Sequence, residues 1–305
     1  MPDFYHYCSE ATELPPMTMS DIALQAELAD RVQRLAGDIG ERHTHQPAAL
    51  LQAITDLEKV WSEAGLEVHS QEYFVDHDMF TNLWVEFPGS SQPESIVVVG
   101  AHYDTVPGTP GADDNGTAVA ALLTLSLRAI RWRPKKTLRF VAFANEEPPY
   151  FMTENMGSYN YARRCQLEGA KIEGMVCLEM LGYYSSERGS QQSPFGILPE
   201  TGNFIALVGN PESRDFIEQA AKAFESECRF PMQAAAVPLD MVPEAGFSDH
   251  WSFWQFGWPA FMVTDTGPLR NPHYHLPSDK PETIDYESYA RVVAGVGRMV
   301  RRLAG

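Results

Sequence analysis

Acidic and histidine side chains follow the apolar stretches of this 305-residue chain at five places. The first is the loop GAHYDTVPGTPGADDNGT, residues 100–117, which holds one His and three Asp among several Gly and Pro residues. The others are Asn145-Glu146-Glu147, Glu179, Ser248-Asp249-His250 and NPHYHLPSD at 271–279. Carboxylates gathered in one low-dielectric pocket raise each other's pKa, so they need cations to stay ionised at neutral pH. Because His with Asp and Glu suits zinc or a harder divalent ion, these residue types predict a metal centre.

Two metal ions about 3.5–4 Å apart need about five ligands, one of them a bridging carboxylate, and a further carboxylate that stays free as a base. The five segments contain enough residues of the right types for such a pair. Each residue also has a structural interpretation when it is taken alone. His102 fits a hydrogen-bonded residue at a strand end, Asp113 and Asp114 fit turn formers or helix caps, and adjacent Glu residues are commonly solvated.

The rest of the sequence predicts elements that would bring these segments together. Strand-like apolar runs are expected at 67–75, 82–87, 95–101, 137–144, 171–180, 204–209 and 258–264. Helices are expected at 20–37, with Ser20 or Asp21 as N-cap, and at 47–64, 117–130, 157–165, 211–227 and 286–303. This alternation predicts an α/β fold, a three-layer sandwich in which helices cover both faces of a mixed, mostly parallel sheet. In such sheets ligands bind at the carboxyl ends of the strands, where the five segments lie.

The chain shows no repeat or linker that would divide it, so we expect a single domain over 1–305, with a helical extension at 1–45 packed on it. A net charge of -18 and a pI near 4.8 argue against nucleic acid as a partner. The start, MPDFYHYCSEATELPP, lacks the features of a signal peptide, and no apolar stretch is long enough to span a membrane. We therefore expect a cytoplasmic protein without membrane contact. The four cysteines have no CxxC spacing, which predicts neither a thiolate zinc site nor a disulfide framework: Cys8, Cys165, Cys177 and Cys228.

Six segments, in sequence order, resemble the co-catalytic di-zinc aminopeptidases of peptidase clan MH, of the aminopeptidase-S and aminopeptidase-Y type. They are HYD at 102–104, GADDNG at 111–116, NEE at 145–147, LEMLG at 178–182, SDHWSF at 248–253 and YHLPSDKPETID at 274–285. The resemblance extends over about residues 95 to 300. One such motif alone would mean little, but six in the same order are specific. The resemblance implies a zinc exopeptidase domain, two zinc ions per chain, and peptide substrates with a free N-terminus.

The resemblance also assigns the five metal ligands. In the first metal position His102 would supply the imidazole and Glu179 a carboxylate, Asp114 would bridge the two metals, and Glu147 and His275 would bind the second metal. Of the two histidines in NPHYHLPSD, only His275 occupies the matching place in YHxPxD. Asp113 is then expected to be structural.

Two catalytic roles follow from the same resemblance. Glu146 would be the general base that takes a proton from the attacking water, and Asp104 would lie behind His102 and orient it. Asp249 is a candidate to lie against Glu146 or the substrate ammonium, with capping of the following helix as the alternative. Tyr274 is a candidate donor to the developing oxyanion, or else a packed ring.

This sequence departs from the pattern of the resembled family at two points. Glu179 stands at a strand end where Asp is the commoner residue, so the side chain at the first metal position is longer by one methylene. The stretch PPYFMTENMGS, residues 148–158, is longer than usual between the Glu pair and the Gly-Ser. We expect that loop to reshape the substrate pocket.

The residues and the resemblance together predict a zinc aminopeptidase, and three alternatives stay open. A carboxypeptidase or dipeptidase would need a cation for the substrate carboxylate, and Arg270 is the obvious candidate nearby. A glutaminyl cyclase-like transferase would share the fold and bind a single zinc. A catalytically inactive interaction protein should have lost ligands or the base, whereas this chain keeps a suitable residue at all six positions, the five metal ligands and the general base.

His250, in the segment Ser248-Asp249-His250, is expected to be structural.

Overall fold

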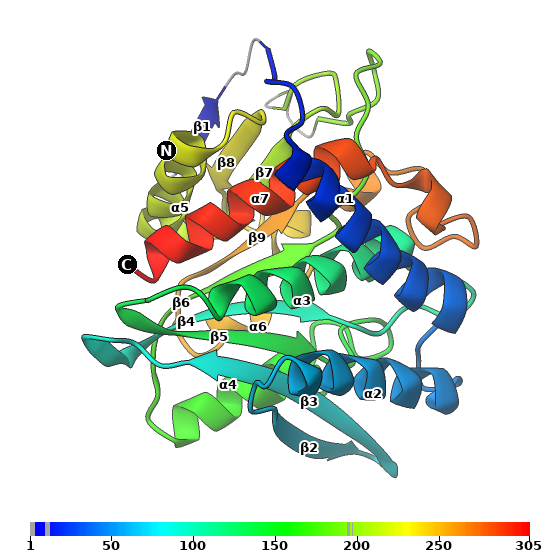
Figure 1. The fold of residues 1–305 in the computed structure, drawn as a ribbon, viewed down its shortest axis with the longest axis vertical. Helices are drawn as coiled ribbons and strands as arrows, with labels where there is room; N and C mark the ends of the chain where they lie inside the picture. The colour runs from blue at the N-terminus through cyan, green and yellow to red at the C-terminus, as the bar shows by residue number, and fades with distance from the viewer. Residues whose placement is uncertain (1–3, 10–12, 194–195, 197) are drawn as a thin grey trace.

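A computed structural model of the chain describes residues 4–9, 13–193, 196 and 198–305. Its centre is a nine-stranded sheet with the order β1-β8-β7-β9-β6-β4-β5-β3-β2 (Figure 1). The strands are β1 (Tyr5–Ser9), β2 (His69–Val75), β3 (Asp78–Phe87), β4 (Gln92–His102), β5 (Lys136–Phe143), β6 (Lys171–Glu179), β7 (Ile205–Gly209), β8 (Met232–Ala236) and β9 (Ala260–Thr264). The four central strands β5, β4, β6 and β9 are parallel, whereas β3 and β7 run antiparallel to their neighbours β5 and β9.

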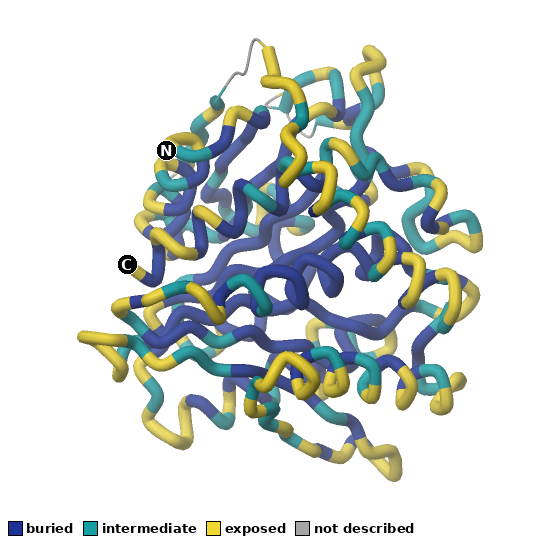
Figure 2. Tube along the Cα trace, viewed as in Figure 1, coloured by how far each residue is buried: buried dark blue, intermediate teal, exposed yellow. Residues whose placement is uncertain are grey.

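Helices cover both faces of this sheet and form the outer layers of a three-layer sandwich. One face carries α1 (Met19–Val32), α2 (Pro47–Glu63), α3 (Ala118–Ala129), α5 (Arg214–Glu227) and α7 (Tyr286–Leu303) (Figure 1). The other carries α4 (Gly157–Leu167) and the short α6 (His250–Trp254). Figure 2 shows the buried residues concentrated in the central strands and in α3. The predicted fold class, a mixed and mostly parallel sheet between helices, is confirmed.

The alternation of side chains along β4 explains why this strand lies at the centre of the sheet. Val97, Val99 and Ala101 belong to the core beneath α3, whereas Ile96 and Val98 belong to the core beneath α4 and α6. Because both faces are covered, the strand has no polar side chain from Ile96 to Ala101, as is typical of parallel central strands. It ends at His102, the first polar side chain that it places at the carboxyl edge.

Two strands were not predicted from the sequence. β8, MQAAA, has little of the β-branched or aromatic character typical of strands, and β1 lies in the segment expected to be helical. Both are defined by pairing, since β1 runs antiparallel to β8 and β8 lies parallel to β7. The predicted cap of the first helix is also wrong. Thr18, not Ser20 or Asp21, is the N-cap, because it has extended backbone angles and its hydroxyl accepts the Asp21 N–H.

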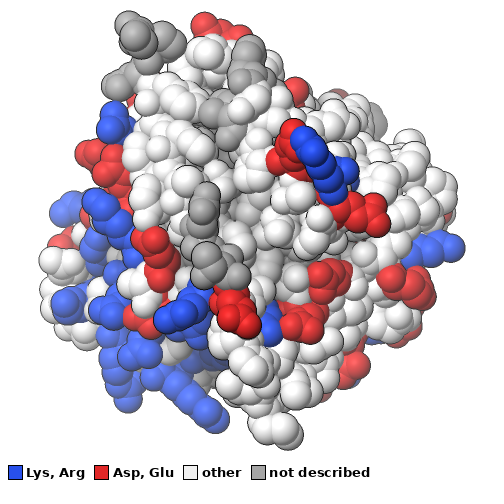
Figure 3. All heavy atoms as spheres, turned by 90° about the horizontal axis from the view of Figure 1, so that it is seen from above, with Lys and Arg blue, Asp and Glu red and all other residues white. Residues whose placement is uncertain are grey.

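Basic side chains gather on one part of the surface. Figure 3 shows Lys and Arg gathered on one side of the face that it presents. A shallow hollow at the ends of α3 and α7 is lined by Arg131, Arg133, Arg298, Arg301 and Arg302. Cations there interact favourably with the negative C-terminal ends of helix dipoles, and Arg302 also pairs with Glu227 at 2.7 Å. Within the described part of the chain, no helix combines the length and apolarity needed to cross a membrane.

Leu28→Ala tests whether the N-terminal helices belong to the same core as the sheet. Leu28 of α1 is fully buried, whereas Leu51 of α2 is 64% exposed. The cavity left at position 28 should lower the free energy of unfolding by about 2–4 kcal/mol, and Leu51→Ala should change it by less than about 0.5 kcal/mol. Urea unfolding measures both. A separate early transition that responds to Leu28→Ala, with the main midpoint unchanged, would show that α1 does not share the core.

Candidate metal centre

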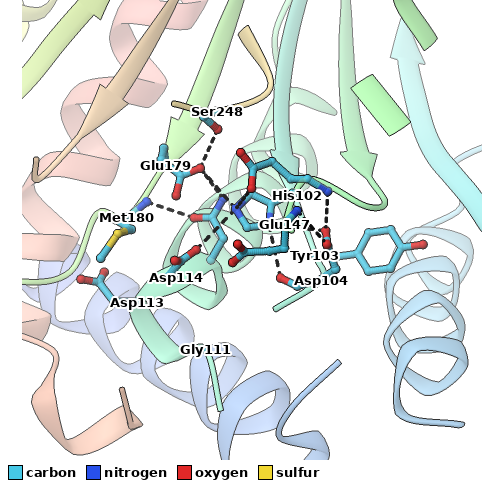
Figure 4. A network of polar contacts seen from close by, with 12 residues as sticks. His102, Tyr103, Asp104, Gly111, Asp113, Asp114, Glu147, Glu179, Met180 and Ser248 are labelled. Atoms are coloured by element: carbon cyan, nitrogen blue, oxygen red, sulfur yellow. Dashed lines mark hydrogen bonds and ion pairs between the residues drawn. The ribbon is translucent and has the colours of Figure 1, made fainter. Parts of the chain in front are cut away.

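Three neighbouring parallel strands bring the predicted residues to one edge of the sheet (Figure 4). His102 is the last residue of β4, Glu179 is the last residue of β6, and the pair Glu146 and Glu147 follows the end of β5. All four side chains are buried. The convergence expected from the positions of these residues in the sequence is therefore present in the fold.

Asp114 lies between the two histidines. Its Oδ1 is 3.5 Å from Nε2 of His102, and its Oδ2 is 3.1 Å from Nε2 of His275. Each carboxylate oxygen thus faces a different imidazole. This arrangement is the one that a carboxylate bridging two metal ions requires.

A further carboxylate accompanies each histidine. Glu179 Oε2 lies 3.3 Å from His102 Nε2, and Glu147 Oε2 lies 3.4 Å from His275 Nε2. Donor atoms of His102, Asp114 and Glu147 also lie within 4.8 Å of one another. Glu147 Oε1 is buried without a hydrogen-bond partner among the described residues. A buried carboxylate oxygen without a partner is costly, so the donor set and this oxygen both fit a metal ion.

Asp104 lies behind His102, as expected, and it also has a contact that the sequence did not reveal. Its carboxylate Oδ1 is 3.5 Å from His102 Nδ1. Its Oδ1 and Oδ2 accept the backbone N–H groups of Glu146 and Glu147, each at 3.1 Å. Asp104 therefore fixes the turn that carries the Glu pair as well as the imidazole.

Two hydrogen-bond donors hold the carboxylate of Glu179. Ser248 Oγ donates to Glu179 Oε2 at 2.6 Å (Figure 4). Asn115 Nδ2 donates to the same oxygen at 3.2 Å. Asn115 also accepts the backbone N–H of Met180 through Oδ1. These bonds orient the longer side chain toward His102. The sequence contained their signals, Asn115 directly after Asp114 and Ser248 before Asp249, but gave neither residue a role.

Burial and the nearby histidines have opposite effects on the pKa values of the carboxyl groups in this site. Burial raises the pKa of Glu146, Glu147 and Glu179, that of Glu147 to about 8. Burial also pushes the pKa of Asp114 upward, but hydrogen bonds from His102 and His275 outweigh it and hold that pKa below its usual value. The carboxylate between the histidines is thus the one best able to stay ionised, as a bridging ligand must.

The site opens into a hollow of about 120 Å³ that adjoins an apolar pocket of about 110 Å³. Glu179, Phe247 and Tyr274 line both. The floor of the apolar pocket consists of side chains from β7, β8 and β9 on one face of the sheet: Ala206, Val208, Ala235, Met262 and Thr264. The hollow itself is lined by four carboxylates, one imidazole and the loop residues Pro148 and Phe151. The long loop after the Glu pair therefore does contribute to the pocket wall.

The two candidate substrate residues lie in different surroundings. Tyr274 stacks on His275, with ring centroids 3.8 Å apart, and lines the hollow. Asp249 is fully buried, and neither of its carboxylate oxygens has a hydrogen-bond partner among the described residues. It is the N-cap residue of α6 but makes no side-chain cap. Burial raises its pKa to about 7. Its role stays a prediction, and direct contact with a substrate would require it to reach the hollow, which it does not line.

Three further residues have structural partners. Asp113 accepts from the backbone of Gly182 and from Asn271 Nδ2 at 2.8 and 2.7 Å. His250 pairs through Nε2 with the carbonyl of Ala245 at 2.8 Å, and burial lowers its pKa to about 4. These contacts agree with the structural roles expected for both. His273 Nδ1 lies 2.9 Å from Ser278 Oγ, and its ring lies against Tyr183.

Residues 82–300 match peptidase family M28. The chain belongs to this family. The resemblance to clan MH aminopeptidases noted in the sequence is thereby confirmed. This M28 protein is 33% identical over 282 residues to the uncharacterized protein YfbL of Escherichia coli, with 88% of the chain and 85% of that protein aligned. It is 28% identical over 258 residues to a probable leucine aminopeptidase of Trichophyton verrucosum, covering 78% of the chain but only 62% of that longer relative.

Two solved structures show how widely the fold of this M28 protein is shared. BSAP, a zinc aminopeptidase from Bacillus subtilis, superposes with a TM-score of 0.73 at 15% identity, over 90% of this chain and 94% of BSAP. The glutaminyl cyclase of Fimbriiglobus ruber superposes with a TM-score of 0.67 at 18% identity, over 95% and 97% of the two chains. At such identities the likeness establishes the zinc-exopeptidase fold alone, since it includes both a peptidase and a cyclase.

We expect the metal-free M28 protein to lose stability as pH rises from about 6 to about 9. Burial raises the pKa of Asp279 to about 8. Burial lowers the pKa of His275, but contacts with Asp114 and Glu147 outweigh it and raise that pKa to about 10. The unfolded chain releases these protons near pH 4 and 6.5, so stability falls as pH approaches the folded-state values. Urea unfolding in a chelator should show a loss of about 1–3 kcal/mol, and an unchanged or higher value at pH 9 would contradict this assignment.

Proposed function

We propose that this M28 protein is a zinc-dependent aminopeptidase that binds two zinc ions and removes N-terminal residues from peptides. The observation that carries the proposal is the position of Asp114, with one carboxylate oxygen facing each histidine, while Glu146 is left beside the site. His102, Asp114 and Glu179 would hold one ion, and His275, Asp114 and Glu147 the other. When bound, zinc supplies Lewis-acid polarisation of the scissile carbonyl and of the attacking water.

Glu146 is the group that would move protons. Its carboxylate oxygen Oε2 is 3.9 Å from His102 Nε2, farther from that imidazole than Asp114 or Glu179, and it lines the hollow. Asp104 fixes its backbone N–H. Burial raises its pKa, which brings the carboxylate closer to the basicity that a general base needs at neutral pH. Glu146 would accept a proton from the attacking water and return it to the leaving amine.

The charge of the hollow favours a substrate with a free N-terminus. Four carboxylates line it, and no Lys or Arg is among the described residues that do so. Three of these carboxylates would bind the two zinc ions, which leaves Glu146 to attract an ammonium group, and this lining offers no Lys or Arg to pair with a substrate carboxylate. Arg270, the candidate cation for a carboxypeptidase, is buried and donates to the carbonyls of Tyr183 and Phe204. These contacts favour the aminopeptidase over a carboxypeptidase.

The apolar pocket next to the hollow would receive the side chain of the N-terminal residue. Its floor includes the small side chains of Ala206 and Ala235, and Ala206 pairs with Thr264 and Val208 with Met262 across β7 and β9. Phe247 and Leu269 supply larger apolar walls. Apolar pockets with a few polar groups at one end select substrates mainly by shape and hydrophobicity. We therefore propose Leu, Met or Phe as the preferred N-terminal residues.

The alternative with support in the comparisons is a glutaminyl cyclase-like transferase, because a cyclase shares the fold. The two histidines on opposite oxygens of Asp114 support two metal positions instead of one. A panel of aminoacyl arylamides, with zinc counted before and after chelation, separates the two activities. About two zinc ions per chain and release of the arylamine support the aminopeptidase, whereas one zinc and pyroglutamate formation would overturn it.

Glu146→Gln should lower kcat for leucyl arylamide by at least about 100-fold, because an amide cannot accept the proton. The zinc content should stay at the wild-type value. Glu154→Gln, an exposed residue of the same loop, is the matched control and should leave kcat unchanged. Retention of wild-type hydrolysis by Glu146→Gln would refute the assigned base. N-acetylated leucyl arylamide should not be hydrolysed by the wild type.

Ala206→Leu should change the substrate preference, because the added atoms fill the floor of the apolar pocket. We expect kcat/KM for leucyl and phenylalanyl arylamides to fall by about tenfold or more, while the alanyl substrate changes by less than about threefold. Each substrate serves as the control for the others within one variant. A uniform loss for all three substrates would mean that this pocket does not receive the N-terminal side chain.

A further inference from the structure

Arg42 is a fully buried arginine beneath the loop that connects the candidate ligands His102 and Asp114. It follows η1 (Gln33–Ile39), in the N-terminal segment that the sequence suggested to be an extension. Its guanidinium donates to five backbone carbonyls at 2.6 to 3.2 Å: Nε to Tyr103, Nη2 to Gly111, and Nη1, whose two hydrogens are shared, to Leu35, Gly40 and Pro110. Three of these carbonyls belong to the loop, close to its two ends.

The backbone of Arg42 joins the same loop. Its N–H donates to Thr105 Oγ1 at 3.0 Å, and its carbonyl accepts the N–H of Thr105 at 2.9 Å. Gly111 is needed for this approach, since it has a φ of +64° and an added Cβ would meet the Asp114 carbonyl and the Arg42 guanidinium. Arg42 therefore fixes the path of the loop through both its side chain and its main chain.

Asp279 holds the other end of the loop by complementary bonds. Its Oδ1 accepts the N–H of Asp113 at 2.9 Å, and its Oδ2 accepts the N–H of Asp114 at 3.1 Å. The Arg42 guanidinium thus binds the loop carbonyls, and the Asp279 carboxyl oxygens bind the loop amides. Together they fix the segment between the two ligands without using either ligand's side chain.

We propose that Arg42 and Asp279 are positioning residues that set the separation of His102 and Asp114 before metal binds, so that the N-terminal segment completes the metal centre. A loop of Gly, Pro and Asp would otherwise sample many conformations, and ordering it would cost entropy on each binding event. Prior ordering by these two buried side chains removes that cost from the binding step.

The positive charge of Arg42 also stabilises the acidic groups near the loop. Burial lowers its pKa to about 10, so the guanidinium remains a cation at neutral pH, and Asp104, Asp279 and Asp114 act to keep it charged. A buried cation near these acids offsets part of their mutual repulsion. Arginine suits the position because its planar group carries five donors in fixed directions, which a lysine cannot reproduce.

The test is zinc affinity, measured by chelator competition on metal-depleted protein whose fold is verified by circular dichroism. Arg42→Met should bind zinc about tenfold or more weakly, as expected when a partner that orients ligands is lost. Arg42→Lys keeps the positive charge but lacks the planar guanidinium, so its zinc affinity should lie between those of the wild type and Arg42→Met. Arg139→Met is the matched control. Arg139 pairs with Glu86 and Tyr161 on β3 and α4, so its loss should lower stability but change zinc affinity by less than about twofold.

Folded Arg42→Met with wild-type zinc affinity would overturn the proposal, and so would an equal loss in Arg139→Met. If Arg42→Met does not fold, the zinc affinities of Arg42→Lys and Asp279→Asn are the test. Wild-type zinc affinity in both variants would overturn the proposal. This inference rests on the proposed zinc site, but different results would refute the inference and the proposed function. A wild-type protein that binds no zinc refutes the function, whereas zinc binding that is indifferent to Arg42 refutes this inference alone.

Discussion

The repulsion among buried carboxylates at one edge of the sheet is the constraint on which the site depends. Asp114, Glu146, Glu147 and Glu179 lie within one small region and are all buried. Ionised groups in such surroundings raise each other's pKa and destabilise the fold unless cations or hydrogen-bond donors oppose them. The two histidines meet part of this need, and a bound divalent ion would meet the rest.

Backbone amides provide much of the remaining compensation. The carboxylates that are not assigned to metal, Asp104, Asp113 and Asp279, accept N–H groups from the turns that carry the ligands. Each such bond gives a buried carboxyl oxygen a donor and fixes a loop at the same time. The acidic character of the opening loop thus has two uses, since some of its acids are candidate ligands and others hold the backbone in place.

The site and its pocket illustrate how one sheet serves two purposes. The carboxyl ends of β4, β5 and β6 position the charged groups, whereas the faces of β7, β8 and β9 form the floor of the apolar pocket. Small residues such as Ala206 and Ala235 leave room there, because larger side chains would fill the space. The alanine-rich β8, which was not predicted because of its weak strand propensity, therefore helps to form the apolar pocket.

The sequence alone determined the fold class, most element positions and the residue types of the metal centre. Periodicity and apolar runs act locally, so helices such as α7 and strands such as β4 could be predicted within a few residues. It did not determine β1, whose formation depends on pairing with β8, or the partners of Glu179. Nor did it indicate Arg42, because a single arginine carries no periodic signal and its five acceptors are distant main-chain carbonyls. Only the tertiary structure brings those carbonyls together, and hydrogen bonds between distant backbone groups leave no pattern in the order of the residues.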